Sequence, residues 1–428
     1  MADPETEINV DLEVQEVLLA ASQHDIPKLR RLLRSNDAAT NPANVKDPET
    51  GASPLHAAIA ACEAEEEDAK TNGAPNGVQS NGEGHTSEQQ ETLQSAVQTV
   101  KLLLQEGAIW NDLDLNDETP GCIARRLGLD ELYEMVVDAG VRAELLLNRL
   151  DGYEQLSDEE MEDDEEQEQQ QETAGTSASS TAEEGESAPQ LVESTTAATD
   201  TAQTGEVDPN VTSSRYLSSD LSFQQDRLLD QDQNGVMMAW ESDIMAKSAK
   251  KLLPTPGLRV LNVGHGMGII DGFFQEQSPA SHHIIEAHPD VVAEMRRKGW
   301  HEKPGVHIHE GRWQDILPEL VTQGEMFDAV YYDTFAESYA DFRDFFTEQV
   351  IGILEQEGKW GFFNGMGADR QISYDVYQKV VEMDLFEAGF DIEWEQIAVP
   401  KLEGEWNGVR RPYWNIDQYR LPLCKYMD

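Results

Sequence analysis

Apolar residues in the first third of the chain recur at intervals of three and four positions. This spacing places them on one face of a helix and predicts an all-α region over 1–150. The first such positions are Val14, Val17, Leu18, Ala21, Leu29, Leu32 and Leu33.

From about residue 211 to the end, short apolar segments alternate with helical patterns such as Pro289–Lys298 and Asp341–Gln356. This alternation predicts βαβ units and a mostly parallel sheet. Two later segments could form an antiparallel edge. The predicted strands are Arg259–Val263, His283–Glu286, Val306–His309, Phe327–Tyr332, Lys359–Phe363, Ile392–Val399 and Trp414–Leu421.

The segment between these regions, 151–210, has no Lys or Arg and consists mainly of Asp, Glu, Gln, Ser, Thr and Ala. Such a composition buries too little apolar surface to offset the entropy of ordering. We therefore expect a disordered acidic linker. Nothing in this run fixes the geometry that a metal ion requires.

Ser53-Pro-Leu-His-Ala-Ala in the N-terminal region resembles the ankyrin signature Thr-Pro-Leu-His-x-Ala. Thr119-Pro follows 66 positions later, two ankyrin periods, with Gly121 and Cys122 in place of Leu-His. Low-complexity sequence at about 63–91 indicates an insertion. We expect two to three degenerate repeats, which either bind proteins or form a helical cap on the rest of the chain.

The net charge of the 428-residue chain is −52, from 31 basic and 83 acidic residues. This charge argues against nucleic acid or an anionic membrane as a partner and favours a basic protein. Three distant cysteines indicate a reducing compartment. The spacing of cysteines and histidines matches no metal motif, so no metal is expected.

A glycine-rich turn, Gly264-x-Gly266-x-Gly268, follows the first strand of the α/β region and precedes a helix. Glycines let the backbone approach a ligand whose polar end meets the helix N-terminus. Glu286 ends the next strand, 22 residues after Gly264, where a carboxylate can accept ribose hydroxyls. A dinucleotide dehydrogenase would have its third glycine one position later.

Other candidate residues stand beside this turn. Trp313, after the third strand, is placed to cover an adenine. Asp333 ends the fourth strand, where an open α/β sheet binds its ligand. Upstream, Glu241 belongs to a Met-Trp-Glu cluster that we interpret as a lid over the cofactor.

Together these motifs resemble guanidinoacetate methyltransferase, and the whole chain resembles the fungal type IV protein arginine methyltransferases. The motifs are Val236-Met-Met-Ala-Trp-Glu, Val263-Gly-His-Gly-Met-Gly, Glu286-Ala-His, Gly311-Arg-Trp and Tyr332-Asp-Thr. The resemblance implies a Rossmann-like class I methyltransferase fold with a mostly parallel seven-stranded sheet over 211–428. It also implies S-adenosyl-L-methionine as cofactor and methylation of the δ-nitrogen (N5) of a protein arginine.

The same resemblance implies a set of cofactor contacts. One lid aromatic is expected among them, and the sequence leaves Tyr216 and Phe223 as alternatives. Asn262 departs from the Glu of the guanidinoacetate enzyme. The implied contacts are Tyr216 or Phe223, Met237, Met245, His265, Gly266, Met267, Gly268, Ile269, Ile270, Glu286, Ala287, His288, Arg312, Trp313 and Asp333.

For the reaction, Glu241 and Asp333 are expected to hold the guanidinium by bidentate hydrogen bonds, with a carboxylate accepting its proton. Thr334 adds a hydrogen bond to the substrate. The paired-Glu hairpin of the common arginine methyltransferases has no match, which argues against ω-nitrogen dimethylation. Two alternatives remain: methylation of a small guanidino compound, and an ankyrin scaffold with an inactive methyltransferase domain.

We expect the partner to be an arginine-containing protein, and the family resemblance implies a ribosomal protein. The enzyme is expected to be a monomer. The cytoplasm is the default location because no basic localisation cluster is visible, and presence in the nucleus is implied by the family alone.

Overall fold

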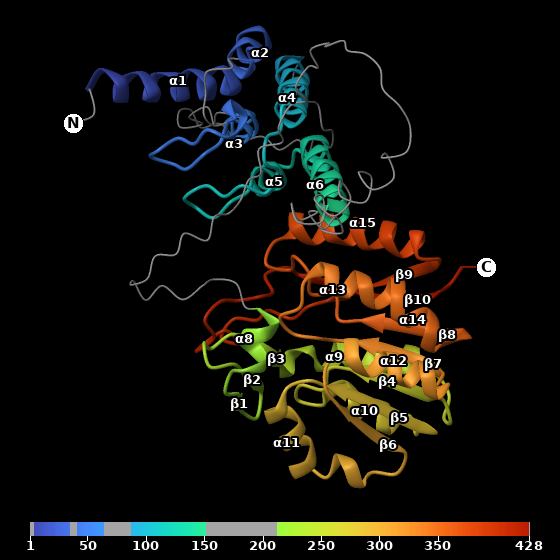
Figure 1. Cartoon of the computed structure of the whole chain (residues 1–428). Helices are drawn as coiled ribbons and strands as arrows, with labels where there is room; N and C mark the ends of the chain where they lie inside the picture. The colour runs from blue at the N-terminus through green and yellow to red at the C-terminus, as the bar shows by residue number, and fades with distance from the viewer. Residues whose placement is uncertain (1–3, 35–40, 64–86, 151–211, 428) are drawn as a thin grey trace, which may run out of the picture. The chain divides into compact units, whose positions relative to one another are not determined.

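The computed structural model describes residues 4–34, 41–63, 87–150 and 212–427 (Figure 1). Residues up to Leu147 and from Thr212 onward form one compact unit. The predicted linker and most of the predicted insertion lie outside the described residues.

The described part of the N-terminal region is helical, with one 3-10 turn at Pro42–Asn44. Helix α4 begins at Ser87, so the last residues of the predicted insertion are helical. The helices are α1 (Pro4–Ser22), α2 (Ile26–Leu33), α3 (Pro54–Ala60), α4 (Ser87–Gln105), α5 (Pro120–Arg126) and α6 (Asp130–Leu150).

The two ankyrin-like motifs begin helices in the same way. Proline stands at the first position of both α3 and α5, where its missing N–H costs no hydrogen bond. The Ser53 hydroxyl and His56 Nδ1 are 2.8 Å apart in a capping box. His56 Nε2 lies 3.1 Å from the Glu118 carbonyl oxygen, which joins the two motifs. Both ring nitrogens of His56 therefore contact groups that hold the two motifs in place.

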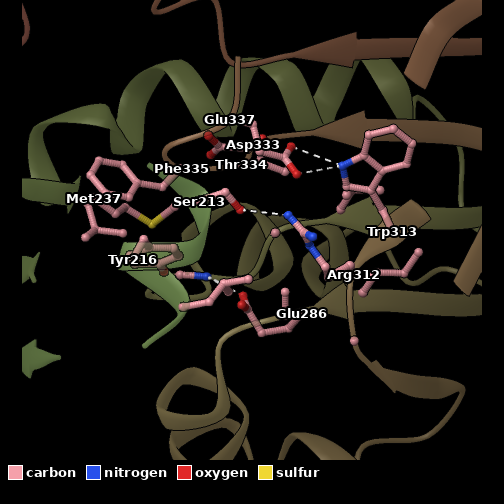
Figure 2. Close-up of a pocket in the computed structure, with 18 residues that line it drawn as sticks. Ser213, Tyr216, Met237, Glu286, Arg312, Trp313, Asp333, Thr334, Phe335 and Glu337 are labelled. Carbon is pink, nitrogen blue, oxygen red and sulfur yellow. Dashed lines mark hydrogen bonds between the residues drawn. The ribbon is translucent and has the colours of Figure 1, made fainter. Parts of the chain in front are cut away.

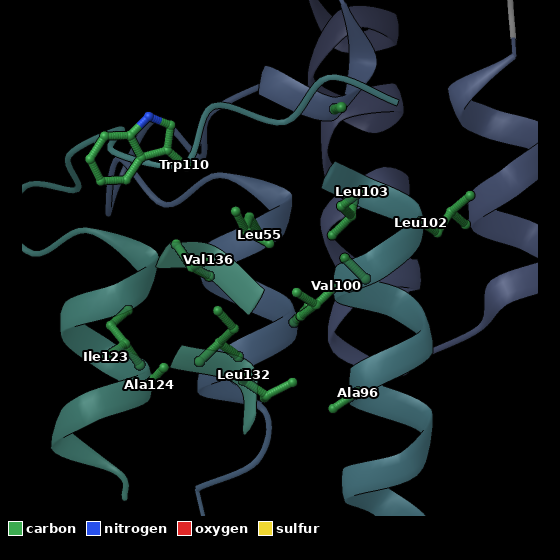
Figure 3. Packing of buried hydrophobic residues seen from close by; sticks show 14 of the residues in the cluster. Leu55, Ala96, Val100, Leu102, Leu103, Trp110, Ile123, Ala124, Leu132 and Val136 are labelled. Carbon is green, nitrogen blue, oxygen red and sulfur yellow. The ribbon is translucent and has the colours of Figure 1, made fainter. Parts of the chain in front are cut away.

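These helices share a buried apolar cluster, part of which is seen in Figure 3. Leu55, Val100 and Leu132 contribute to it and are fully buried. The cluster also takes in Ile372, Val376 and Val380 of helix α15 (Gln371–Glu387), from the C-terminal region. The N-terminal helices and α15 therefore bury apolar surface together, which is favourable in proportion to its area.

Glycines allow this close packing. A Cβ on Gly121 would overlap the end of the Ile372 side chain, and one on Gly140 would lie 2.7 Å from Val376. Polar contacts flank the apolar ones: the Tyr133 hydroxyl donates to Asp375 at 2.6 Å. The glycine at position 121, where the ankyrin signature has Leu, is thus explained by contact with α15.

Replacing Gly121 by Leu, the residue of the ankyrin signature, is expected to destabilise the protein by about 1–3 kcal/mol, the usual cost of overpacking. Thermal unfolding measures the change. Gly272→Ala in α10 (Ile269–Glu276) is the control, because a Cβ there meets no atom within 4 Å. An unchanged unfolding temperature in Gly121→Leu would contradict the packing of α5 against α15.

The C-terminal region contains a seven-stranded sheet in the order β6-β5-β4-β7-β8-β10-β9. Strands β6 to β8 pair in parallel, whereas β10 is antiparallel to both neighbours. The predicted Rossmann-like α/β fold is confirmed. The strands are β4 (Arg259–Val263), β5 (Ser281–Glu286), β6 (Val306–Glu310), β7 (Phe327–Tyr332), β8 (Leu354–Phe362), β9 (Phe390–Ala398) and β10 (Gln418–Tyr426).

Helices cover both faces of this sheet (Figure 1). Helices α9 (Ser242–Leu252), α10 and α11 (Pro289–Arg297) pack on one face with Val260 of β4. On the other face, with Leu261, lie α12 (Trp313–Gln323), α13 (Tyr339–Asp344), the π-turn Phe345–Gln349, α14 (Val350–Ile353) and α15. Because successive strand residues face opposite sides, β4 buries Val260 in one core and Leu261 in the other.

A small three-stranded sheet precedes the large one. It follows α8 (Ser213–Leu217) and consists of β1 (Ser222–Phe223), β2 (Arg227–Leu229) and β3 (Gly235–Met238), all antiparallel. The predicted Met-Trp-Glu cluster runs from β3 through the 3-10 turn Ala239–Glu241 into α9. The cluster therefore forms a strand and a turn, which lead into a helix.

Predicted element boundaries differ from the structure in two regions of the chain. The predicted helix Asp341–Gln356 ends at Ile353, and β8 begins at Leu354, five residues before the predicted strand. The last strand runs over Gln418–Tyr426 instead of Trp414–Leu421. Its position is set by continuous pairing with β9, from Gln418 opposite Ala398 to Tyr426 opposite Phe390. Such long-range pairing has no local signature.

Candidate active site

The chain changes direction in the sheet between β4 and β7. After β4 it proceeds to β5 on one side, and after β7 it proceeds to β8 on the other. Open α/β sheets bind ligands at such a point, beyond the carboxyl ends of the strands. Gly264 follows β4 and Asp333 follows β7. The Asp333 N–H donates to the Val263 carbonyl at 2.9 Å, which holds the two strand ends together.

The glycine turn takes backbone angles that other residues rarely adopt, with φ of +94° at Gly264 and +80° at Gly268. A Cβ on Gly264 would overlap the backbone oxygen of Asp333. The backbone therefore passes too close to β7 for any side chain.

Buried polar side chains brace this turn from behind. Asp271 in α10 is fully buried; its oxygens lie 2.6 Å from His265 Nδ1 and 2.9 Å from His282 Nε2. The Asn262 amide donates to the same carboxylate and to the Gly264 carbonyl. Burial alone would raise the pKa of Asp271, but its histidine partners lower that pKa to about 2. Asn262, which departs from the related Glu, is thus a bracing residue.

Glu286 lies beside the glycine turn at the end of β5. Its Oε2 accepts the His265 N–H at 2.8 Å, and its Oε1 accepts the His288 N–H at 2.7 Å. Each carboxylate oxygen can accept more than one hydrogen bond. Glu286 is therefore oriented by the backbone and keeps acceptor capacity for the two hydroxyls of a ribose.

Two neighbouring cavities open at the crevice. The first, the cofactor-side cavity, lies beyond the carboxyl ends of the parallel strands, where Gly264, Ala287, Gly311 and Asp333 line it. Figure 2 shows Tyr216, Met237, Glu286 and Trp313 around it. The predicted cofactor residues that line it are Tyr216, Met237, Gly266, Glu286, Ala287, Arg312, Trp313 and Asp333.

Other predicted contacts do not line this cavity. Met245 and Ile270 are fully buried in the core formed by α9, α10 and the sheet. Of the two aromatic alternatives, Tyr216 lines the cavity, whereas Phe223 packs at the margin of that core. The rotation of the helices and the pairing of the strands turn these side chains toward the core.

The remaining predicted residues support the cavity. The ring of His265 contacts Asp271, and the Met267 N–H donates to Met237 Sδ at 3.2 Å. His288 caps α11, and its Nε2 lies 3.0 Å from the Tyr216 carbonyl oxygen. Gly268 and Ile269 continue the turn into α10.

The second cavity, the acceptor-side cavity, lies next to the first and shares Asp333, Thr334 and Glu337 with it. Glu241 and Tyr413 also line it, so the predicted catalytic pair does meet in one cavity. Its aromatic lining residues are Tyr332, Phe335, Phe342, Phe362, Phe363 and Tyr413. Aromatic faces and carboxylates together suit a guanidinium, which stacks and accepts bidentate pairing.

Both predicted catalytic carboxylates have perturbed acidities. Burial raises the pKa of Asp333 to about 8, with a further contribution from the charge of Asp271. Burial also raises the pKa of Glu241 well above its usual value, and the charge of Asp333 adds to this. The Asp333 Oδ2 atom is buried and has no hydrogen-bond partner among the residues that the structure describes. A cation that paired with Glu241 and Asp333 would offset the free-energy cost of burying these two carboxylates.

Glu337 is a carboxylate of this site that the sequence analysis missed. It lies in both cavities and accepts the Trp313 indole N–H at 2.9 Å (Figure 2). It also accepts a short hydrogen bond from the Tyr332 hydroxyl. It links the predicted adenine cover to the end of β7. Glu337 lies in a loop four residues after Asp333 and belongs to no sequence motif, so the sequence analysis did not identify it.

Two further findings concern the described residues alone. Within these ranges, no group of three or more His, Cys, Asp or Glu residues is arranged to hold a metal ion. No described helix is long and apolar enough to cross a membrane.

Comparison with known proteins decides the family. The chain is 80% identical to protein arginine N-methyltransferase 2 of Emericella nidulans over the full length of both chains. The chain belongs to the protein arginine N-methyltransferase 2 family. A relative of the same name from Neurospora crassa is 45% identical, covering 97% of this chain and 96% of its own. Residues 214–399 also match the family profile of guanidinoacetate N-methyltransferase.

Membership in this family makes the chain an S-adenosyl-L-methionine-dependent arginine methyltransferase. A putative S-adenosylmethionine-dependent methyltransferase from Listeria monocytogenes is 17% identical, with a TM-score of 0.33, over 43% of this chain and 98% of its own. In the site described above, Glu286, Met237 and Trp313 would hold the methyl donor.

Proposed function

We propose that the enzyme places one methyl group on the δ-nitrogen (N5) of an arginine in a protein. The main support is the acceptor-side cavity, in which Glu241 and Asp333 stand among aromatic rings. The match of 214–399 to the guanidinoacetate N-methyltransferase profile supports a guanidine acceptor.

The charges of the cavity favour a protein arginine over a small guanidino acid. Its described lining includes three acidic residues, Glu241, Asp333 and Glu337, and no Lys, Arg or His. The carboxylate of a small guanidino acid would find no basic side chain there. An arginine within a polypeptide has no such carboxylate, and only its cationic end enters the cavity.

S-adenosyl-L-methionine supplies an electrophilic methyl group on a sulfonium. Glu241 and Asp333 orient the guanidinium so that one nitrogen faces the cofactor-side cavity, which accelerates transfer chiefly by positioning. The C–N bond would form as the bond between the methyl carbon and the sulfonium sulfur breaks, with S-adenosylhomocysteine as the leaving group, and the nitrogen would lose a proton to a carboxylate. The raised pKa values of both carboxyls suit proton acceptance near neutral pH.

We base the expected substrate protein and cellular location on the charge of the chain and on its family. A net charge of −52 suits a basic substrate, and we expect a ribosomal protein, methylated by a monomeric enzyme in the cytoplasm and nucleus. The ankyrin-like repeats predicted in the N-terminal helices would add protein contacts.

The test uses an extract of cells that lack this protein, incubated with the full-length enzyme and an isotopically labelled methyl donor. Labelled proteins are hydrolysed and analysed by mass spectrometry, with Glu241→Gln as control. We expect label in N5-methylarginine with the active enzyme only. Label in ω-methylarginine would overturn the δ-nitrogen assignment, and label confined to small molecules would favour a guanidino metabolite.

A further inference from the structure

Glu241 is held by a residue far away in the sequence. Its side chain is 3% exposed at the start of α9, and its Oε1 accepts a short hydrogen bond from the Tyr413 hydroxyl. A buried carboxylate needs such donors to remain ionised and in one orientation.

Tyr413 is itself fixed by packing. Its ring lies 4.9 Å from that of Trp406 and 6.1 Å from that of Trp240, between ring centres. A Cβ on Gly235 would lie 3.0 Å from the Tyr413 ring, a tight contact, so the glycine in β3 makes room for this ring. The phenol hydroxyl is thereby directed at Glu241.

The loop between β9 and β10, which carries Tyr413, is also tied to the small three-stranded sheet and its β2–β3 turn. The Arg410 N–H donates to the Gln233 carbonyl at 2.8 Å, and Arg227 Nη1 donates to the Asn407 carbonyl at 2.9 Å. The loop thus forms a fixed wall of the acceptor-side cavity. It lies beyond residue 399, where the match to the guanidinoacetate N-methyltransferase profile ends.

We propose that Tyr413 is a positioning residue, whose hydroxyl aligns the Glu241 carboxylate for the guanidinium of the acceptor arginine. This inference rests on the proposed function of the acceptor-side cavity. Tyr413 acts through Glu241, so its contribution disappears when Glu241 is not a carboxylate.

Two titratable groups act on Glu241: Asp333 from the end of β7 and Tyr413 from the loop. Tyr331 of β7 and Tyr419 of β10 also lie near it, and the charge of Glu241 contributes to raising the pKa of each. Burial and Asp333 raise the pKa of Glu241, whereas the Tyr413 hydrogen bond lowers it. Removing the hydroxyl raises this pKa further. Guanidinium binding, which requires the ionised carboxylate, then begins at a higher pH.

The experiment measures binding of N-acetyl-arginine methylamide to the full-length protein loaded with S-adenosylhomocysteine, by calorimetry between pH 6 and about 9. Tyr413→Phe keeps the ring and removes only the hydroxyl. We expect about 10-fold weaker binding at pH 7, typical for a hydrogen bond to a charged group, and a pH dependence shifted upward. Tyr426→Phe is the control, because the Tyr426 hydroxyl bonds only to backbone carbonyls of Ile351 and Leu354 outside the cavity.

A double-mutant cycle separates the possible outcomes. Adding Tyr413→Phe to Glu241→Gln should cause no further loss, whereas an equal loss in both backgrounds would overturn the positioning role. Wild-type binding by Tyr413→Phe would overturn it as well. If Glu241→Gln itself binds the probe normally, the proposed acceptor site fails instead. Affinity for S-adenosylhomocysteine, measured in each variant, shows that the fold is intact.

Discussion

Glu241→Gln is expected to lower turnover with the protein acceptor by about 100-fold or more, the usual scale for an acid–base group. Glutamine matches glutamate in shape but has no charge. It neither pairs with the guanidinium nor accepts its proton. Because Glu241 lines the acceptor-side cavity and not the cofactor-side cavity, affinity for S-adenosylhomocysteine should change little.

Steady-state rates and calorimetry test this result together, with Glu403→Gln as control for loss of an exposed carboxylate. In the wild type, kcat/KM should rise with pH, because the raised pKa values of Glu241 and Asp333 keep both carboxyls protonated at low pH. Because the two carboxyls interact, the rise of kcat/KM with pH reports on Glu241 and Asp333 together and not on either one alone. Near-normal turnover in Glu241→Gln would remove this residue from the mechanism.

Gly264→Ala is expected to weaken cofactor binding by at least about 10-fold and to lower the unfolding temperature. The positive φ of +94° costs an L-residue on the order of 1–3 kcal/mol. In addition, the new Cβ would overlap the Asp333 carbonyl oxygen, which is backbone and cannot rotate away. Relief requires β4 to separate from β7, at the point where both cavities meet.

Gly257→Ala is the matched control for this variant. Gly257 has a similar φ of +88°, but a Cβ there meets no atom within 4 Å. It should therefore lose some stability and still bind S-adenosylhomocysteine as the wild type does. If the two variants behave alike, backbone strain alone accounts for the effect, and the contact between Gly264 and β7 is unimportant.

The core of the site could be located from the sequence because its residues occupy the ends of consecutive parallel strands. Gly264, Glu286 and Asp333 each follow or end a strand with a clear apolar pattern, and parallel strands present their carboxyl ends at one edge. Glu241 was found through its Met-Trp-Glu cluster. These positions depend on local pattern and on one rule of sheet topology.

Other features depended on contacts between distant segments. Tyr413 reaches Glu241 across 172 positions, and Gly121 is required by Ile372 in a helix about 250 residues later. Met245 and Ile270 match their motifs, yet the rotation of α9 and α10 on the sheet buries them in the core. The sequence by itself determined the fold class, the glycine turn and the strand-end carboxylates, because local periodicity encodes them. Only the tertiary structure decided which side chains face the cavities, since packing and long-range pairing set that direction.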